Sequence, residues 1–187
     1  MATPSLQGRK IAILATDGFE QSELLDPRHA FDAAGATTRI VSLKNGQIRA
    51  WHKADWGERV AVDSTVAETR ADDYDALLLP GGVMNPDKLR TDKAAVAFVK
   101  AFLDAGKPVA AICHGPWTIV EAGAAKGRRM TSWPSLQTDL RNAGATWVDE
   151  EVVVDGNLVT SRKPDDLPAF CRKIVEEFAE GSHAAQR

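Results

Sequence analysis

Two short stretches of this chain, 76–79 and 108–112, are apolar at nearly every position and do not alternate with polar residues. Strands that are apolar on both faces belong to the centre of a parallel sheet that helices cover on each side. The first stretch stops at Pro80-Gly81-Gly82, and the second breaks into Cys113-His114-Gly115-Pro116. The pattern therefore predicts an α/β fold in which both stretches lie near the middle of the sheet.

The remaining elements follow from periodicity and from the glycines that end helices. A helix at 21–34 between strands at 10–15 and 38–43 gives a β-α-β order, which implies parallel pairing. Asp155-Gly156-Asn157 between two apolar runs is a hairpin signal. The other expected elements are a third strand at 75–79, a helix at 93–105, a fourth strand at 108–112, hairpin strands at 151–154 and 158–161, and a closing helix at 165–179.

Composition limits the classes of partner. The 187 residues carry a formal net charge of −3, so no basic surface is expected for nucleic acid or for an anionic membrane. No linker divides the chain, and we expect one domain over 1–187. No apolar run approaches the ~20 residues of a membrane helix, and none of secretory length precedes Ile11. A cytoplasmic protein that binds small or neutral molecules fits these features.

The two cysteines, Cys113 and Cys171, show neither C-x-x-C nor metal-ligand spacing, so we expect no disulfide, metal or cofactor. Cys171 fits the apolar face of the closing helix and is assigned no chemistry. Cys113 is different, because a side chain on a strand-to-helix turn lies at the carboxyl edge of the sheet, where open α/β proteins bind ligands. The N–H groups at the start of the next helix favour a thiolate there. We therefore expect a nucleophile whose pKa is lowered.

Other chemistry-bearing residues are expected at the same edge. Glu20 follows the first strand, Gly81 and Gly82 follow the third, and Cys113 follows the fourth. A purely structural explanation exists for two acids, since Glu20 suits a helix start and Asp87 could cap a short turn. His114 adjoins Cys113 in sequence, but neighbours on a turn usually point apart.

An acidic thiol alone does not account for turnover, because a lower pKa also lowers the nucleophilicity of the thiolate. Backbone donors and proton transfer must supply the rate. Gly81 and Gly82 provide an exposed backbone for this purpose, and the N–H groups of Gly82 and His114 are the expected oxyanion hole. Beside a thiolate, Glu20 should hold a proton at neutral pH and share it with the sulfur.

Four segments, Asp17-Gly18-Phe19-Glu20, Leu79-Pro80-Gly81-Gly82, 110–116 and 131–136, resemble the intracellular protease I (PfpI) branch of the ThiJ/PfpI superfamily. The resemblance implies a flavodoxin-like three-layer sandwich: a mostly parallel central sheet, helices on both faces and a small β-hairpin. It also implies that Cys113 is the nucleophile, that Glu20 hydrogen-bonds it, and that an acid from a neighbouring subunit completes His114. The matching loop here offers Asp87, whereas the founding members have glutamate, and it is one residue longer. A homodimer or higher homo-oligomer is expected.

Members of that superfamily have been assigned proteolysis, chaperone activity, glyoxalase III activity and deglycation. We rank chemistry on reactive dicarbonyls or their adducts ahead of peptide cleavage, because a peptide's leaving amine must be protonated by a correctly oriented His114. A redox sensor or chaperone that uses an oxidisable Cys113 remains an alternative. A class I glutamine amidotransferase fits poorly, because the only histidine after His114 is His183 in the tail.

Trp51 and Trp56 could line a pocket or pack under a loop.

Overall fold

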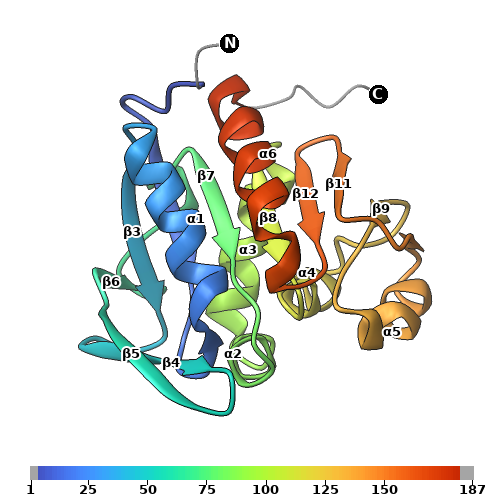
Figure 1. Cartoon of the computed structure of the whole chain (residues 1–187), viewed down its shortest axis with the longest axis horizontal. Helices are drawn as coiled ribbons and strands as arrows, with labels where there is room; N and C mark the ends of the chain where they lie inside the picture. Colours follow the sequence, from blue (N-terminus) through green and yellow to red (C-terminus); the bar gives the residue numbers. More distant parts are fainter. Residues whose placement is uncertain (1–3, 182–187) are drawn as a thin grey trace.

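The computed structural model describes residues 4–181. Its centre is a seven-stranded sheet in the order β11-β12-β8-β7-β1-β3-β6, parallel except for β11 (Figure 1). The strands are β1 (Lys10–Leu14), β3 (Thr37–Ser42), β6 (Ser64–Thr65), β7 (Ala76–Leu79), β8 (Val109–Ile112), β11 (Val152–Asp155) and β12 (Leu158–Ser161). The predicted α/β fold with a mostly parallel sheet is confirmed, and β7 and β8 lie side by side near its middle.

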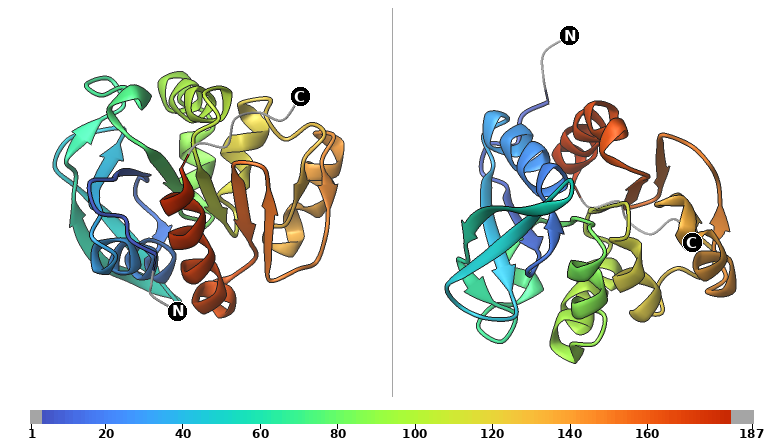
Figure 2. Two further views of the ribbon diagram at one scale, coloured as in Figure 1. Left: turned by 90° about the horizontal axis from the view of Figure 1, so that it is seen from above. Right: turned by 60° about the horizontal axis from the view of Figure 1, so that its bottom comes forward.

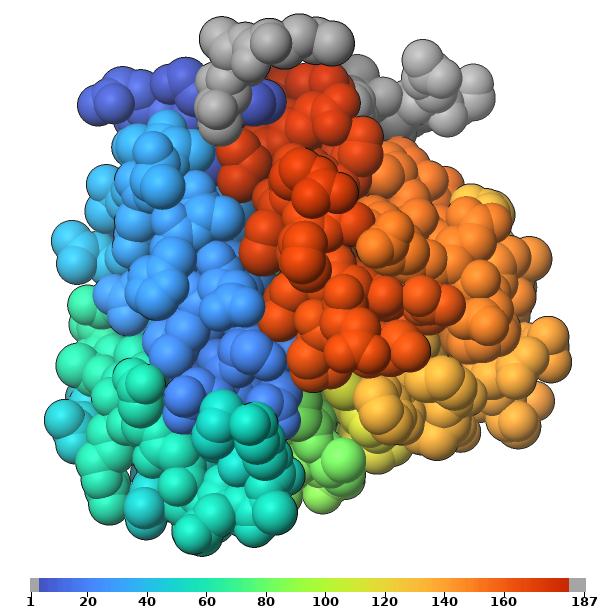
Figure 3. Space-filling view, viewed as in Figure 1, coloured from blue at the N-terminus to red at the C-terminus, as the bar shows by residue number. Residues whose placement is uncertain are grey.

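Helices cover both faces of this sheet. On one face lie α1 (Gln21–Ala33) and α6 (Leu167–Glu180), which pack side by side (Figures 1 and 2). Figure 3 shows the two helices in contact along this face. The other face carries α2 (Met84–Leu89), α3 (Lys93–Asp104) and α4 (Pro116–Glu121). This is the three-layer arrangement predicted from the sequence.

The strands between the helix layers supply two separate cores. Ile11 and Ile13 of β1 pack toward α1 and α6, while Ala12 and Leu14 pack toward α3 and α4. All four residues of β7 and all four of β8 are buried. Because successive side chains of a strand point to opposite faces, a strand with two covered faces must be apolar throughout. This explains why the two runs do not alternate.

The hairpin predicted around Asp155-Gly156-Asn157 is confirmed, since β11 and β12 pair antiparallel with Asp155 opposite Leu158. The closing helix is also present. Beyond β12 the chain forms the short helix η3 (Pro164–Asp166) and then α6, whose buried residues include Leu167, Phe170 and Ile174.

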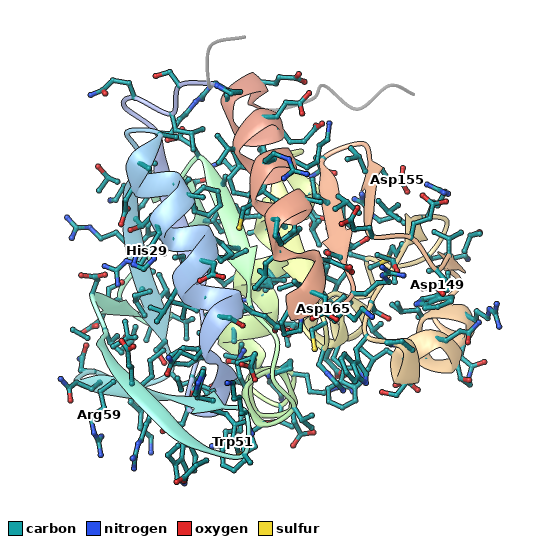
Figure 4. All side chains as sticks on the ribbon, viewed as in Figure 1. His29, Trp51, Arg59, Asp149, Asp155 and Asp165 are labelled. Atoms are coloured by element: carbon teal, nitrogen blue, oxygen red, sulfur yellow. The ribbon has the colours of Figure 1, made fainter. Side chains whose placement is uncertain are left out.

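Two small sheets were not predicted. One contains β2 (Phe19–Glu20), β4 (Gln47–His52) and β5 (Asp55–Ala61), and the other pairs β9 (Arg129–Met130) with β10 (Thr146–Trp147). Trp51 and Trp56 form an edge-to-face pair on the β4–β5 hairpin, with ring centroids 5.5 Å apart. Figure 4 shows Trp51 at the end of the molecule where this hairpin lies. These rings therefore pack on a hairpin rather than under a loop.

The remaining short elements are η1 (Ala71–Asp73), η2 (Pro134–Leu136) and α5 (Gln137–Asn142). Within residues 4–181, no helix combines the length and the apolar character needed to cross a membrane.

Candidate active site

Cys113 occupies a sharp turn between β8 and α4, and its backbone has a φ of 61°. Any residue other than glycine is sterically strained in this left-handed region, so neighbouring contacts must hold Cys113 there. The Cys113 N–H donates to the Ser161 carbonyl at 3.1 Å, and the Trp133 N–H donates to the Cys113 carbonyl at 2.9 Å. The side chain is thereby fixed at the carboxyl edge of the sheet, as predicted.

The carboxyl group beside the sulfur belongs to Glu23, not to Glu20. Glu23 lies in the first turn of α1 and is fully buried. Its Oε2 accepts the Gly81 N–H at 2.8 Å, and its carboxyl hydrogen-bonds the Cys113 thiol. No nitrogen or oxygen donor among residues 4–181 reaches its other oxygen, Oε1. A carboxyl with one unpaired buried oxygen is suited to carry a proton.

The start of α1 explains the correction from Glu20 to Glu23. Glu20 is the residue before α1, its N–H donates to the Gly81 carbonyl at 3.3 Å, and its half-buried side chain lies within electrostatic reach of His52. Glu23 shares the buried face of α1 with Leu24, Pro27 and Phe31. An acid within an otherwise apolar helical stripe is the signal that could have identified it.

The pKa values of the buried pair are both raised. Burial, with a smaller contribution from the nearby charge of Glu20, raises the pKa of Glu23 to about 8. Burial likewise raises the pKa of the Cys113 thiol, with the neighbouring Glu23 carboxylate adding to the effect. The prediction of a lowered thiol pKa is therefore wrong for the isolated chain. The N–H groups at the turn do favour the thiolate, but the cost of removing a charge from water exceeds their effect.

The imidazole of His114 lies next to the thiol, with Nδ1 3.1 Å from Sγ. The left-handed turn at Cys113 thus brings two consecutive side chains together, and the expected Cys/His pair is present. Burial lowers the pKa of His114, so the ring is neutral near pH 7 and can accept a proton. The rings of Trp117 and Trp133 flank it.

Glycine backbones complete the surroundings of the sulfur. The N–H groups of Gly82 and His114 both hydrogen-bond the Cys113 sulfur, so the two expected oxyanion-hole donors lie beside the reacting atom. Gly82 has a φ of 74°, which favours glycine. At Gly81 a side chain would place its Cβ 2.7 Å from the Cβ of Cys113, so this close approach also requires glycine.

Asp87 is not brought to His114 within one chain. It lies exposed on α2, which begins at Met84, so it caps no helix. Its role as an acid donated by a partner subunit therefore stays a prediction. Cys171 is half-buried against the core that α1 and α6 share, and burial raises its pKa to about 12. No group of three or more metal-ligating side chains occurs in the part of the chain that the structure describes.

The site therefore contains a thiol that contacts both a protonated carboxyl and a neutral imidazole, with two backbone donors at the sulfur. β1, β7 and β8 are adjacent strands, and Glu23, Gly81 and Cys113 each follow one of them. The order of strands along the chain reverses at β1 and β7, and this is where open α/β sheets bind ligands. Such a constellation can add sulfur to an electrophilic carbon and move protons without building up net charge.

The chain is similar to known proteins in sequence and in fold. The sequence profile of the DJ-1/PfpI family matches residues 9–177. The chain is 45% identical to the deglycase TK1284 of Thermococcus kodakarensis over 89% of this chain and 98% of that protein. It is also 45% identical to YraA, a Bacillus subtilis protein named as a candidate cysteine protease, over 89% and 96% of the two chains. The crystal structure of Drosophila melanogaster DJ-1beta superposes with a TM-score of 0.82 at 28% identity, covering 91% of this chain and 90% of that one.

Proposed function

Because this chain belongs to the DJ-1/PfpI family, we propose that it is a cysteine-dependent hydrolase or lyase that acts on reactive dicarbonyls or their adducts. Cys113 is the nucleophile, and Glu23 takes the proton-transfer role expected of Glu20. The observation that carries the proposal is the buried Cys113–Glu23 hydrogen bond, with His114 Nδ1 3.1 Å from the same sulfur. Relatives named as deglycases and as a candidate cysteine protease support this class of chemistry.

The first step with methylglyoxal forms a bond between the sulfur and the aldehyde carbon. The thiol proton passes to His114 Nδ1, and the electrons of the C=O π bond move to oxygen. That oxygen takes the proton of Glu23, which leaves a neutral hemithioacetal, a Glu23 carboxylate and a His114 imidazolium. The N–H groups of Gly82 and His114 stabilise the charge that develops on oxygen.

Later steps return each group to its starting state. The Glu23 carboxylate removes the hydrogen of the former aldehyde carbon as a proton, and the imidazolium protonates the neighbouring ketone oxygen, giving an enediol. His114 then takes the hydroxyl proton at the sulfur-bearing carbon while Glu23 protonates the other carbon, which gives a thioester. Water attacks the thioester, Glu23 accepts the proton of the water, and His114 returns a proton to the departing sulfur. The product is lactic acid, and no external oxidant or reductant is consumed.

Peptide cleavage is the second candidate, favoured by the similarity to YraA. It requires His114 to protonate an amine leaving group, which is easier if an acid holds the ring. Asp87 of a partner subunit would be that acid in a homodimer or higher homo-oligomer. A non-enzymatic redox or chaperone role is less favoured, because Cys113 is only 5% exposed and its pKa is raised by burial.

The proposed location is the cytoplasm. Cys113 and Cys171 are both free, and a catalytic thiol is preserved in a reducing compartment. One relative at 45% identity is named general stress protein 18 of Bacillus subtilis, which fits a role against reactive metabolites.

The deciding experiment identifies the product formed from methylglyoxal, with a fluorogenic peptide run in parallel. We expect lactate from the unmodified protein and from Cys171→Ala, and none from Cys113→Ala. Cys171 is a matched control because it is the only other thiol in the sequence. Peptide cleavage without lactate would favour the protease alternative. Addition of oxygen to Cys113 at low peroxide, with neither activity, would favour the sensor.

A further inference from the structure

The imidazole of His114 is packed against two tryptophan rings. Trp133 stacks on it with ring centroids 5.9 Å apart and planes inclined by 23°. Trp117 meets it edge to face, at 5.1 Å and 69°. One indole therefore covers a face of the imidazole while the other limits its rotation.

Further contacts hold the backbone of Trp133 and the indole of Trp117. The backbone N–H of Trp133 donates to the Cys113 carbonyl at 2.9 Å, which ties the backbone that carries this ring to the strained turn. The indole N–H of Trp117 donates to Asp139 on α5 at 2.9 Å. The guanidinium of Arg90 lies 5.4 Å from the centre of the Trp117 ring and pairs with Glu121 at 3.4 Å. Trp117 is therefore held by its own side-chain contacts, while Trp133 is partly exposed and is held through its backbone.

The hydrogen bonds of the described residues give the His114 ring one partner, the Cys113 sulfur. In most Cys–His pairs an acid or amide bound to the other ring nitrogen sets the orientation of the imidazole. Here two indoles occupy the positions around the ring. An aromatic face also attracts a cation, so a stacked indole stabilises the imidazolium that forms when His114 accepts the thiol proton.

We propose that Trp133 and Trp117 are positioning residues that hold Nδ1 of His114 toward Cys113 and favour its protonated form during attack by the sulfur. This inference rests on the proposed function only for the reaction that the activated thiol carries out. An acid from a partner subunit would act in addition, since an indole ring fixes the plane of the imidazole but accepts no proton from it.

The test measures the rate of alkylation of Cys113 by iodoacetamide as a function of pH, in a Cys171→Ala background that leaves one thiol. Trp133→Leu removes the stacked ring, and we expect a roughly tenfold slower reaction near neutral pH. At high pH, where hydroxide ionises the thiol, the rates should converge. The midpoint of the pH profile therefore moves to higher pH. Trp133→Tyr keeps an aromatic face and should restore most of the rate.

Two further variants make the test specific. Trp56→Leu is the matched control, because Trp56 is exposed to 40%, compared with 38% for Trp133, and also packs edge to face on a second tryptophan. It should leave the profile unchanged. Asp139→Leu releases Trp117 without touching His114, and we expect a smaller shift in the same direction. If Trp133→Leu does not fold, the pH profile of Cys113 alkylation in Asp139→Leu tests the positioning role.

An unchanged pH profile in the folded variants would overturn the positioning role. Alkylation needs no turnover, so the result is independent of the natural substrate. A shifted profile in a protein that makes no lactate would keep the positioning role and refute the dicarbonyl chemistry. An unchanged pH profile in Trp133→Leu, together with lactate formation, would refute the positioning role and keep the dicarbonyl chemistry.

Discussion

At the scale of single residues, two acids three positions apart have different environments. Glu20 and Glu23 both follow β1, but only Glu23 is fully buried and hydrogen-bonded to the thiol. Its chemistry comes from desolvation, which keeps a proton on the carboxyl at a pH where an exposed glutamate would be ionised. A protonated acid next to a thiol can both donate to a carbonyl oxygen and later accept a proton from carbon.

Glu23→Gln tests this role. Glutamine keeps the size of the side chain and can still accept the Gly81 N–H, but it has no acid proton to donate. We expect kcat for lactate formation to fall about 10²-fold or more. Glu20→Gln is the matched control and should change kcat far less. If kcat fell equally in the two variants, Glu20 would contribute to proton transfer as much as Glu23.

The raised pKa of Glu23 also predicts how stability depends on pH. An acid with a folded-state pKa of about 8 and an ordinary value of 4.5 binds more protons in the folded state between these limits. Its stabilising contribution is complete below pH 4.5 and is lost as the pH rises through 8. The loss is about 3–5 kcal/mol.

Urea unfolding at pH 5.5 and pH 9 measures this dependence. Glu23→Gln removes the titrating group, so its free energy of unfolding should vary less between the two pH values than that of the unmodified protein. Stability that rises toward pH 9 in the unmodified protein would show that Glu23 is already ionised at neutral pH.

At the scale of elements, the close approach of β7, β8 and α4 holds the turn in place. Gly115 begins the step from the turn into α4, and its N–H donates to the Ile112 carbonyl at 2.9 Å. A Cβ at this position would lie 2.6 Å from the Leu79 carbonyl oxygen and 2.9 Å from that of Ile112. Both atoms belong to central strands, which cannot move aside without breaking the sheet.

Gly115→Ala should therefore destabilise the protein by about 1–3 kcal/mol and displace Cys113 from Glu23. Gly127→Ala is a useful control, since a Cβ there has no atom within 4 Å and only the positive φ of 76° opposes it. We expect the Gly115 variant to lose turnover as well as stability, whereas the Gly127 variant keeps full activity. Thermal melting and the lactate assay measure the two effects, and full activity in Gly115→Ala would contradict the packing argument.

At the scale of the whole molecule, assembly decides whether His114 gains an acid. Asp87 is exposed on α2, and the hydrogen bonds of the described residues do not join it to His114, so we expect such a contact only from another copy of the chain. If this contact forms, activity per chain should fall on dilution below the dissociation constant of the dimer. Asp87→Asn should lower kcat without changing the free energy of unfolding. Activity that is independent of protein concentration would exclude a shared site.

The sequence by itself determined the sheet and the position of the thiol. Runs without alternation, such as 76–79 and 108–112, bury both faces in any arrangement, so a central parallel sheet with Cys113 at its carboxyl edge follows from local pattern. The hairpin at 151–161 was equally clear, because turn chemistry is local. The β4–β5 hairpin was missed, since β5 is mostly exposed and lacks the apolar alternation of a buried face, although Ile48 and Ala50 of β4 are buried.

Only the tertiary structure decided which acid reaches the sulfur, whether the sulfur ionises, and what surrounds His114. The first depends on where α1 begins, because Glu20 lies in extended backbone before the helix, whereas Glu23 lies in its first turn on the buried face. The second depends on how completely distant segments exclude water, which raises the pKa of both members of the pair. The third depends on Trp133, which lies 20 residues from Cys113 in sequence and reaches its neighbour only through the folded chain.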